Sequence, residues 1–327
     1  MPRLIDLSTN DKDFFQSLLH DAGTRYDGRQ FDQMRDVDIS FGDSYGHVNL
    51  TLGKTKLVVR ISAEVSKPYE DRPHEGIFII TTDISAMASP QFENMRQSED
   101  EVLLTRLIEK AIRRSNALDV ESLVISAGSA CWIIRADVHY LNFDGGLVDA
   151  TCLGVIAGLL HFRRPDTSVE GNSYVVHSLE ERNPIPLSIL HIPISVTFSF
   201  FKPPVKTTAN TTTTIKKDSP DDYDQDMEDA APNSIAKSDV ILVDTTAKEE
   251  SLRDSYMTIT INKNRELCQV SKSGGTEVDG YVIMNCASTA YNIATKLTDL
   301  IQTKLKQDEL KRTTPALVSE LQAENDR

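Results

Sequence analysis

Apolar positions along this chain switch repeatedly between the strand period of two and the helix period near 3.6. The first helical stretch is predicted from Asn10 to Ala22, with Asn10 as the cap and Gly23 as the stop. Its shared apolar side consists of Phe14, Phe15, Leu18 and Leu19. Alternating segments between residues 48 and 82, punctuated by Gly and Pro, then predict an antiparallel meander.

A second helix is predicted from about Ser98 to Ser115, and a third after Gly146, where residues 148–162 are apolar. The last and longest helix runs from about Gly280 to Lys306 in this reading. Strands are expected over 122–127, 130–141, from 174, and over 193–201, 240–244, 256–261 and 266–270. Strands followed by a helix, three times over, indicate an α+β architecture with mostly antiparallel sheets and packed helices.

Residues 1–311 are interpreted as one domain, and residues 312–327 as a C-terminal tail. A low-complexity stretch over 202–238 interrupts the domain with a Thr-rich run and then an acidic patch, which predicts a disordered loop insertion. The formal net charge is −14, but seven acids lie between Asp218 and Asp229 with no base among them. The remainder is only mildly acidic, so charge alone does not exclude a nucleic-acid partner.

Several chemical classes are disfavoured by the sequence. The four cysteines are far apart and form no Cys-x-x-Cys pair, and the histidines form no zinc-protease motif. No Gly-x-Ser-x-Gly nucleophile elbow occurs, and no run of 18 uncharged apolar residues is present. We therefore expect no metal, no cofactor and no membrane association.

The segment Asp144-Gly145-Gly146-Leu147-Val148-Asp149 has the form of a phosphate-binding turn without the matching side chains. A Gly-Gly turn between a strand and a helix presents backbone N–H groups that can hold an anion. No Arg, Lys, Ser or Thr accompanies them, and Asp149 is expected to place a negative charge where an oxyanion would lie. The backbone suits phosphate, whereas the side chains oppose it.

A basic stripe on the second predicted helix gives the strongest sign of a binding surface. Arg106, Lys110 and Arg114 follow at i, i+4 and i+8, with Arg113 beside them, and the apolar residues of the helix centre on the opposite side. This stripe is either an ordinary solvated helix face or an electrostatic contact for RNA phosphates. Asp244 and Glu250, six residues apart at a strand end, are either structural acids or a pair for acid/base work or Mg²⁺.

Several motifs, in order, resemble the RNase PH family: Arg25-x-Asp27-Gly28-Arg29, Gly53-Lys54-Thr55-Lys56, Ile112-Arg113-Arg114-Ser115 and Trp132-x-Ile134-Arg135. Three more narrow the resemblance to the RNase PH-like ring subunits of the eukaryotic RNA exosome: Phe162-Arg163-Arg164-Pro165-Asp166, Glu181-Arg182-Asn183-Pro184 and Leu242-Val243-Asp244. The resemblance spans the chain from the first helix to the last, apart from the insertion and the tail.

The resemblance implies a single RNase PH-type domain whose βαβ crossover is left-handed, against the usual rule. It implies a hetero-hexameric ring with other RNase PH-like subunits, RNA-binding cap proteins, a separate hydrolytic nuclease and single-stranded RNA, in the nucleus, nucleolus and cytoplasm. Active relatives bind the attacking phosphate with Thr or Ser and then Arg, where this chain has Leu147 and Val148. They also carry an Asp pair, of which Asp244 is kept and Glu250 replaces the second member.

The expected function is therefore that of a non-catalytic ring subunit that supports 3′ to 5′ processing and degradation of rRNA, mRNA and other RNAs. In partner subunits of archaeal rings, bases on the matching helix hold the RNA backbone, which assigns that role to Arg106, Lys110, Arg113 and Arg114. The alternatives are a phosphate-dependent 3′ to 5′ exoribonuclease and a protein adaptor that never meets RNA.

Overall fold

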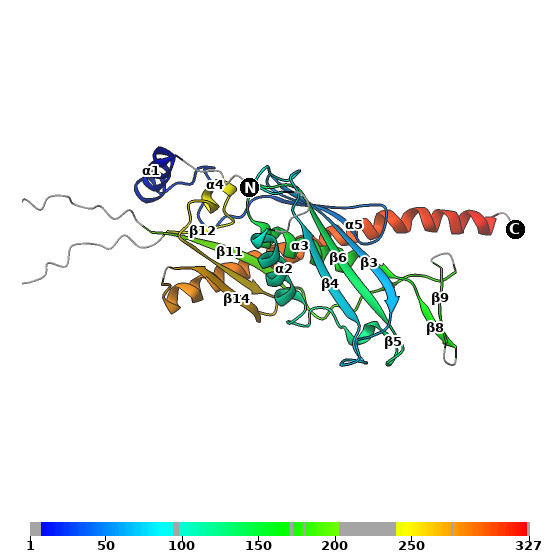
Figure 1. The fold of residues 1–327 in the computed structure, drawn as a ribbon. Helices are drawn as coiled ribbons and strands as arrows, with labels where there is room; N and C mark the ends of the chain where they lie inside the picture. Colours follow the sequence, from blue (N-terminus) through cyan, green and yellow to red (C-terminus); the bar gives the residue numbers. More distant parts are fainter. Residues whose placement is uncertain are drawn as a thin grey trace, which may run out of the picture.

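A computed structural model of the chain describes residues 8–93, 98–170, 173–178, 181–202, 240–275 and 277–325 (Figure 1). The first sheet has the order β1-β2-β3-β6-β4, with β5 also paired to β6. Its strands are β1 (Val37–Phe41), β2 (His47–Leu52), β3 (Thr55–Ser66), β4 (Ile77–Asp83), β5 (Val124–Ser126) and β6 (Ala130–Asn142). Only β4 and β6 are parallel in this sheet, and α2 (Glu99–Ile112) lies in the connection between them.

The second sheet is antiparallel throughout, in the order β12-β11-β13-β14. It consists of β11 (Ile194–Phe201), β12 (Val240–Val243), β13 (Ser255–Ile261) and β14 (Leu267–Gly274). Two small two-stranded sheets complete the fold: β7 (Arg163–Arg164) with β10 (Ile185–Pro186), and β8 (Thr167–Glu170) with β9 (Ser173–Val176). The α+β class with mostly antiparallel sheets, predicted from the sequence, is confirmed.

The helix α3 (Leu147–His161) lies at the centre of the molecule, where it contacts β2 and β3 on one side and β11 on the other. Nearly all of its residues are buried, which fits its lack of a polar face. The long helix α5 (Gly280–Asn325) packs against β11 and β13 and then extends past the body of the domain (Figure 1). The main core is formed by side chains from both sheets and from α2, α3 and α5.

A smaller cluster fixes the N-terminal helix α1 (Thr9–Ser17) to the second sheet through Phe15, Leu19, Phe201 and Leu242. A π-helical turn, Leu18–Ala22, follows α1 and ends at Gly23 as predicted. The predicted cap at Asn10 is wrong, because the Ser8 side chain accepts the hydrogen bond from the Asp11 N–H.

The start of α2 matches the sequence prediction because Ser98 and Glu101 form a reciprocal capping box, whereas the helix ends at Ile112 and not at the predicted Ser115. The predicted end of the last helix is wrong, since α5 continues through the segment interpreted as a tail, to Asn325. The insertion over 202–238 lies outside the described residues, apart from Lys202. Among the helices of the described part, none combines the length and apolar character needed to cross a membrane.

Candidate functional site

The Gly-Gly turn joins the end of β6 to the start of α3 and packs tightly against the segment after β12. Gly145 and Gly146 have φ angles of 77° and 69°. A Cβ on Gly145 would lie 2.6 Å from the carbonyl oxygen of Thr245, and one on Gly146 would lie 2.6 Å from Arg35 Nη2. Both positions therefore require glycine for conformation and for space.

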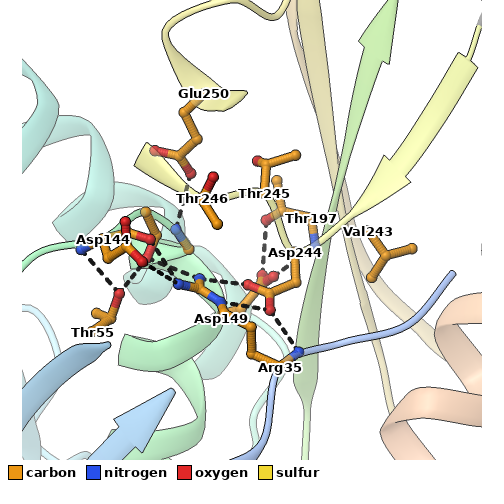
Figure 2. Close-up of polar contacts among 12 residues, drawn as sticks. Arg35, Thr55, Asp144, Asp149, Thr197, Val243, Asp244, Thr245, Thr246 and Glu250 are labelled. Carbon is orange, nitrogen blue, oxygen red and sulfur yellow. Dashed lines mark hydrogen bonds and ion pairs between the residues drawn. The ribbon is translucent and has the colours of Figure 1, made fainter. Parts of the chain in front are cut away.

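The amide at the start of α3 already binds a carboxylate of the chain itself. Gly146 donates its N–H to Glu250 Oε1 at 2.9 Å (Figure 2), and Glu250 is the last residue of the short helix α4 (Ala247–Glu250). Burial raises the pKa of Glu250 above its ordinary value, while the nearby Arg253 guanidinium, 3.7 Å away, acts in the opposite direction. This carboxylate accepts the hydrogen bond of the N–H group that a bound phosphate would use at this turn.

Asp244, predicted as the first member of a carboxylate pair, instead forms a buried double contact with Arg35. Arg35 Nη2 and Nε lie 2.7 and 2.8 Å from the two carboxylate oxygens, and the Arg35 backbone N–H donates to Oδ2 at 2.8 Å (Figure 2). Arg35 also donates to the carbonyl oxygens of Asp144 and Gly145. One arginine thus fixes Asp244 to the Gly-Gly turn.

Two further arginines reinforce this cluster. Arg25 and Arg29 each donate to the backbone carbonyl of Asp244, at 3.0 and 3.2 Å. Arg25 is itself buried in an ion pair with Glu249, at 2.7 Å. Asp244 and Glu250 have different hydrogen-bond partners, Arg35 and the Gly146 amide, and after burial the charge of Asp244 also contributes to the raised pKa of Glu250. No group of three His, Cys, Asp or Glu side chains is placed to hold a metal ion in the described residues.

The prediction for Asp149 needs a correction. Its carboxylate faces β11 and accepts hydrogen bonds from the Thr197 N–H at 3.0 Å and the Thr197 hydroxyl at 2.8 Å (Figure 2). Full burial raises the pKa of Asp149 to about 7, and the charge of Asp244 acts in the same direction. The acid bound to the Gly146 amide is therefore Glu250, whereas Asp149 joins α3 to the second sheet.

Leu147 and Val148 are half-buried and line a hollow of about 150 Å³ beside the turn. Leu103, Leu104 and Leu107 of α2 form part of the opposite wall, and Glu250 and Arg253 form a polar part of the lining. Leu147 and Val148 provide neither a hydroxyl nor a guanidinium for a bound phosphate.

The basic stripe lies on the exposed side of α2, as predicted, with Leu104, Ile108, Ala111 and Ile112 buried on the other side. The Arg106 side chain is 70% exposed and that of Arg113 is 38% exposed. Glu109 lies between them and pairs with Arg106 at 2.8 Å and with Arg113 at 3.1 Å. Surface pairs of this kind contribute less than about 1 kcal/mol, so a polyanion can compete for the two arginines.

A polar hollow of about 360 Å³ lies at the C-terminal end of the stripe. Arg113 and Arg114 line it together with Arg72, from the loop between β3 and β4, and with Glu75 and Glu109.

The structure brings Asp244 and Glu250 to the Gly-Gly turn. Of the four bases, Arg106 and Lys110 lie in α2, and Arg113 and Arg114 follow directly on its end. Residues nearer the start of α2, from Asp100 to Leu107, line the hollow beside the turn.

Arg35 was not predicted as a site residue, and Arg25 and Arg29 were noted only as part of a motif. The available signal was three arginines within eleven residues of an acidic chain, at positions 25, 29 and 35. Their buried acidic partners, Glu249 and Asp244, lie more than 200 residues away, so no local spacing could identify these pairs.

Residues 33–165 match domain 1 of the 3′ exoribonuclease family, of the RNase PH type, and residues 234–293 match domain 2. The chain is 48% identical over 313 residues to exosome complex component RRP45 of Saccharomyces cerevisiae, covering 95% of each chain. It is 44% identical over 327 residues to exosome complex component rrp45 of Schizosaccharomyces pombe, covering all of both chains.

The fold is similar to that of a subunit in the structure of the Archaeoglobus fulgidus exosome with RNA bound to the active site. The TM-score is 0.68 at 28% sequence identity, covering 89% of this chain and 97% of that one. A chain of an archaeal exosome core is also similar, with a TM-score of 0.64 at 26% identity, covering 90% of this chain and 96% of that one.

Proposed function

We propose that this chain is a non-catalytic member of the exosome ring. The chain belongs to the RNase PH-type 3′ exoribonuclease family and is a subunit of that ring. The observation that carries the proposal is the hydrogen bond from Gly146 N–H to Glu250. A phosphorolytic enzyme must bind inorganic phosphate at this turn, and here a part-buried carboxylate of the chain itself accepts the hydrogen bond of the amide.

The charges around the turn support the same conclusion. Asp149, Asp244 and Glu250 place three acids close to it, and the guanidinium of Arg35 is committed to Asp244 and to two carbonyl oxygens. Leu147 and Val148 add no hydroxyl or guanidinium at the turn. Arg253, which lines the hollow beside it, already lies 3.7 Å from Glu250, so an entering phosphate would have to compete with a carboxylate for this cation. Asp244 and Glu250 are, in this proposal, structural remnants of a catalytic pair.

We further propose that Arg106, Lys110, Arg113 and Arg114 hold single-stranded RNA through its phosphates. Their exposure and alignment on α2 suit sequence-independent contact with a phosphate backbone. One structural relative is an exosome with RNA bound, which supports an RNA path along this fold. The remaining partners proposed for the chain are RNase PH-like neighbours in a hetero-hexameric ring, cap proteins and a hydrolytic nuclease, acting in nucleus, nucleolus and cytoplasm.

The competing function is phosphate-dependent 3′ to 5′ exoribonuclease activity. The purified chain, alone and with its ring partner, would be incubated with labelled oligoadenylate and inorganic phosphate. The proposal predicts no release of nucleoside diphosphate that depends on this chain. Phosphate-dependent release of nucleoside diphosphate by the chain alone would support the exoribonuclease instead.

Charge reversal of the stripe tests the RNA contact. Changing Arg106, Lys110, Arg113 and Arg114 to Glu should lower RNA crosslinking to the assembled ring about tenfold or more at low salt, since phosphate contacts dominate such binding. A matched control reverses four exposed lysines on other elements, namely Lys12, Lys263, Lys306 and Lys311. Equal crosslinking by both variants and the unchanged ring would favour the protein adaptor.

A further inference from the structure

The hairpin β8–β9 extends from the body of the molecule as a sheet of its own (Figure 1). It follows directly on the motif Phe162-Arg163-Arg164-Pro165-Asp166, for which the proposed RNA contact and the loss of phosphorolysis provide no role. A two-stranded hairpin is marginally stable in water unless a third element or a packed face supports it. This hairpin therefore requires support from further contacts.

One face of the hairpin is apolar and exposed. Val169 lies opposite Tyr174 in the register, and Thr167 lies opposite Val176, so these four side chains share a face. Val169, Tyr174 and Val176 are 52%, 44% and 42% exposed. The face carries no charge, so it is unsuited to RNA phosphates and suited to apolar protein surface.

The base of the hairpin is held in place by polar contacts. Asp166 accepts from Arg182 at 2.9 Å, and its carbonyl oxygen accepts from the His177 N–H. The Ser168 hydroxyl is 2.8 Å from His177 Nε2. The contact between Asp166 and Arg182 thus joins the motif before the hairpin to the motif after it, and it fixes the direction in which the apolar face points. A fixed face binds with a smaller loss of conformational entropy.

We propose that this face docks on an adjacent RNase PH-like subunit of the ring, an inference that rests on the proposed hexameric arrangement. Three side chains bury far less than the roughly 800 Å² per partner that a stable, independent interface requires. A partner that is held only by this hairpin would not stay bound. A ring neighbour, which is held by further contacts over the rest of the subunit, satisfies this requirement.

The backbone adds a second means of contact. Among the described residues β8 and β9 pair only with each other, and β5 lies near β8, so the outer edge of β9 is the more open one. An extended segment of the neighbour can add to this edge while its alternate side chains cover the apolar face.

A photocrosslinking residue at position 174, in the full chain reconstituted with its ring subunits, tests the proposal. The expected product joins this chain to one RNase PH-like subunit, identified by mass spectrometry of the band. The same residue at position 175, on the opposite face of the hairpin, should give a much lower yield. A product with a cap protein, the nuclease or RNA, or no product at all, would overturn the proposal.

A second measurement separates docking from folding. Tyr174→Asp should reduce incorporation into the ring at least several-fold in a competition with the unchanged chain, whereas Val175→Asp should not. Both variants should unfold at the same temperature as the unchanged chain. Normal incorporation of the Tyr174→Asp chain would contradict the inference. RNA crosslinking and nucleoside diphosphate release report separately on the proposed function.

Discussion

Removing the charge of Asp244 tests the interpretation that this acid is structural. Asp244→Asn is the suitable change, because the residue has a φ angle of 49° and Asn tolerates the left-handed region better than other residues. The substitution keeps the size of the side chain and its backbone conformation. It removes the nearer anionic partner of the buried Arg35 guanidinium and leaves it only the carboxylate of Asp144, at 3.6 Å, among the ion pairs of the described residues.

The expected loss is about 3 to 5 kcal/mol in the free energy of unfolding, the range measured when one partner of a buried pair is removed. The geometry supports this range, since Asp244 is 1% exposed and accepts three hydrogen bonds from Arg35, including its backbone N–H. Arg35→Met should cost a similar amount. The double variant should cost little more than either single change, because each one already breaks the same contact.

Urea unfolding of the purified chain, followed by fluorescence and circular dichroism, gives these values. The control is Asp38→Asn, which removes an exposed pair with Lys304 whose side chains are 69% and 37% exposed, and should cost less than about 1 kcal/mol. A loss below about 1 kcal/mol for Asp244→Asn, or additive losses in the double variant, would refute the structural assignment.

Two further predictions concern the same region. In the folded state the pKa of Asp149 is raised from its ordinary 3.8 to about 7. Between these pH values the folded state binds more protons than the unfolded state. The free energy of unfolding therefore falls as the pH rises from about 4 to 7. Between pH 5 and pH 8 the free energy of unfolding should fall by roughly 3 kcal/mol through Asp149, since the assay covers only the two pH units below its pKa of about 7. Urea unfolding at these two pH values should show that Asp149→Asn removes this fall; an equal fall in both proteins would contradict this. Gly145→Ala should lower the free energy of unfolding by about 2 kcal/mol or more beyond the loss caused by Gly28→Ala. Both glycines have a positive φ angle, but only at Gly145 would the new Cβ meet backbone atoms, at 2.6 Å. Equal thermal shifts for the two variants would show that space at the turn is not limiting.

Local patterns in the sequence predicted most of the fold. The capping residues of α2, the continuous apolar run of α3 and the alternation in β6 are each visible within a few neighbouring residues. The end of α5 was missed because Thr313-Thr314-Pro315 is a combination that disfavours a helix interior, and only the structure shows that the helix continues past it.

The sequence predicted residues of the candidate site but not the hydrogen bonds and ion pairs between them. The Gly-Gly turn, Asp244 and Glu250 were identified by residue type and spacing. Their partners were not, because Glu250 bonds an amide 104 residues earlier and Asp244 pairs with Arg35, 209 residues away. The assignment of Asp149 was wrong because its orientation depends on the packing of α3 against β11, which sequence spacing does not contain.

The central claim is that the turn at the start of α3 cannot take up phosphate, and a titration followed by NMR tests it directly. Inorganic phosphate would be added to the isotope-labelled chain while the amide signals of Gly145 and Gly146 are recorded, with sulfate at equal ionic strength as the reference. We expect no saturable shift, because Glu250 accepts the hydrogen bond of the Gly146 amide. Saturable, phosphate-specific shifts confined to residues 144–149 would contradict it.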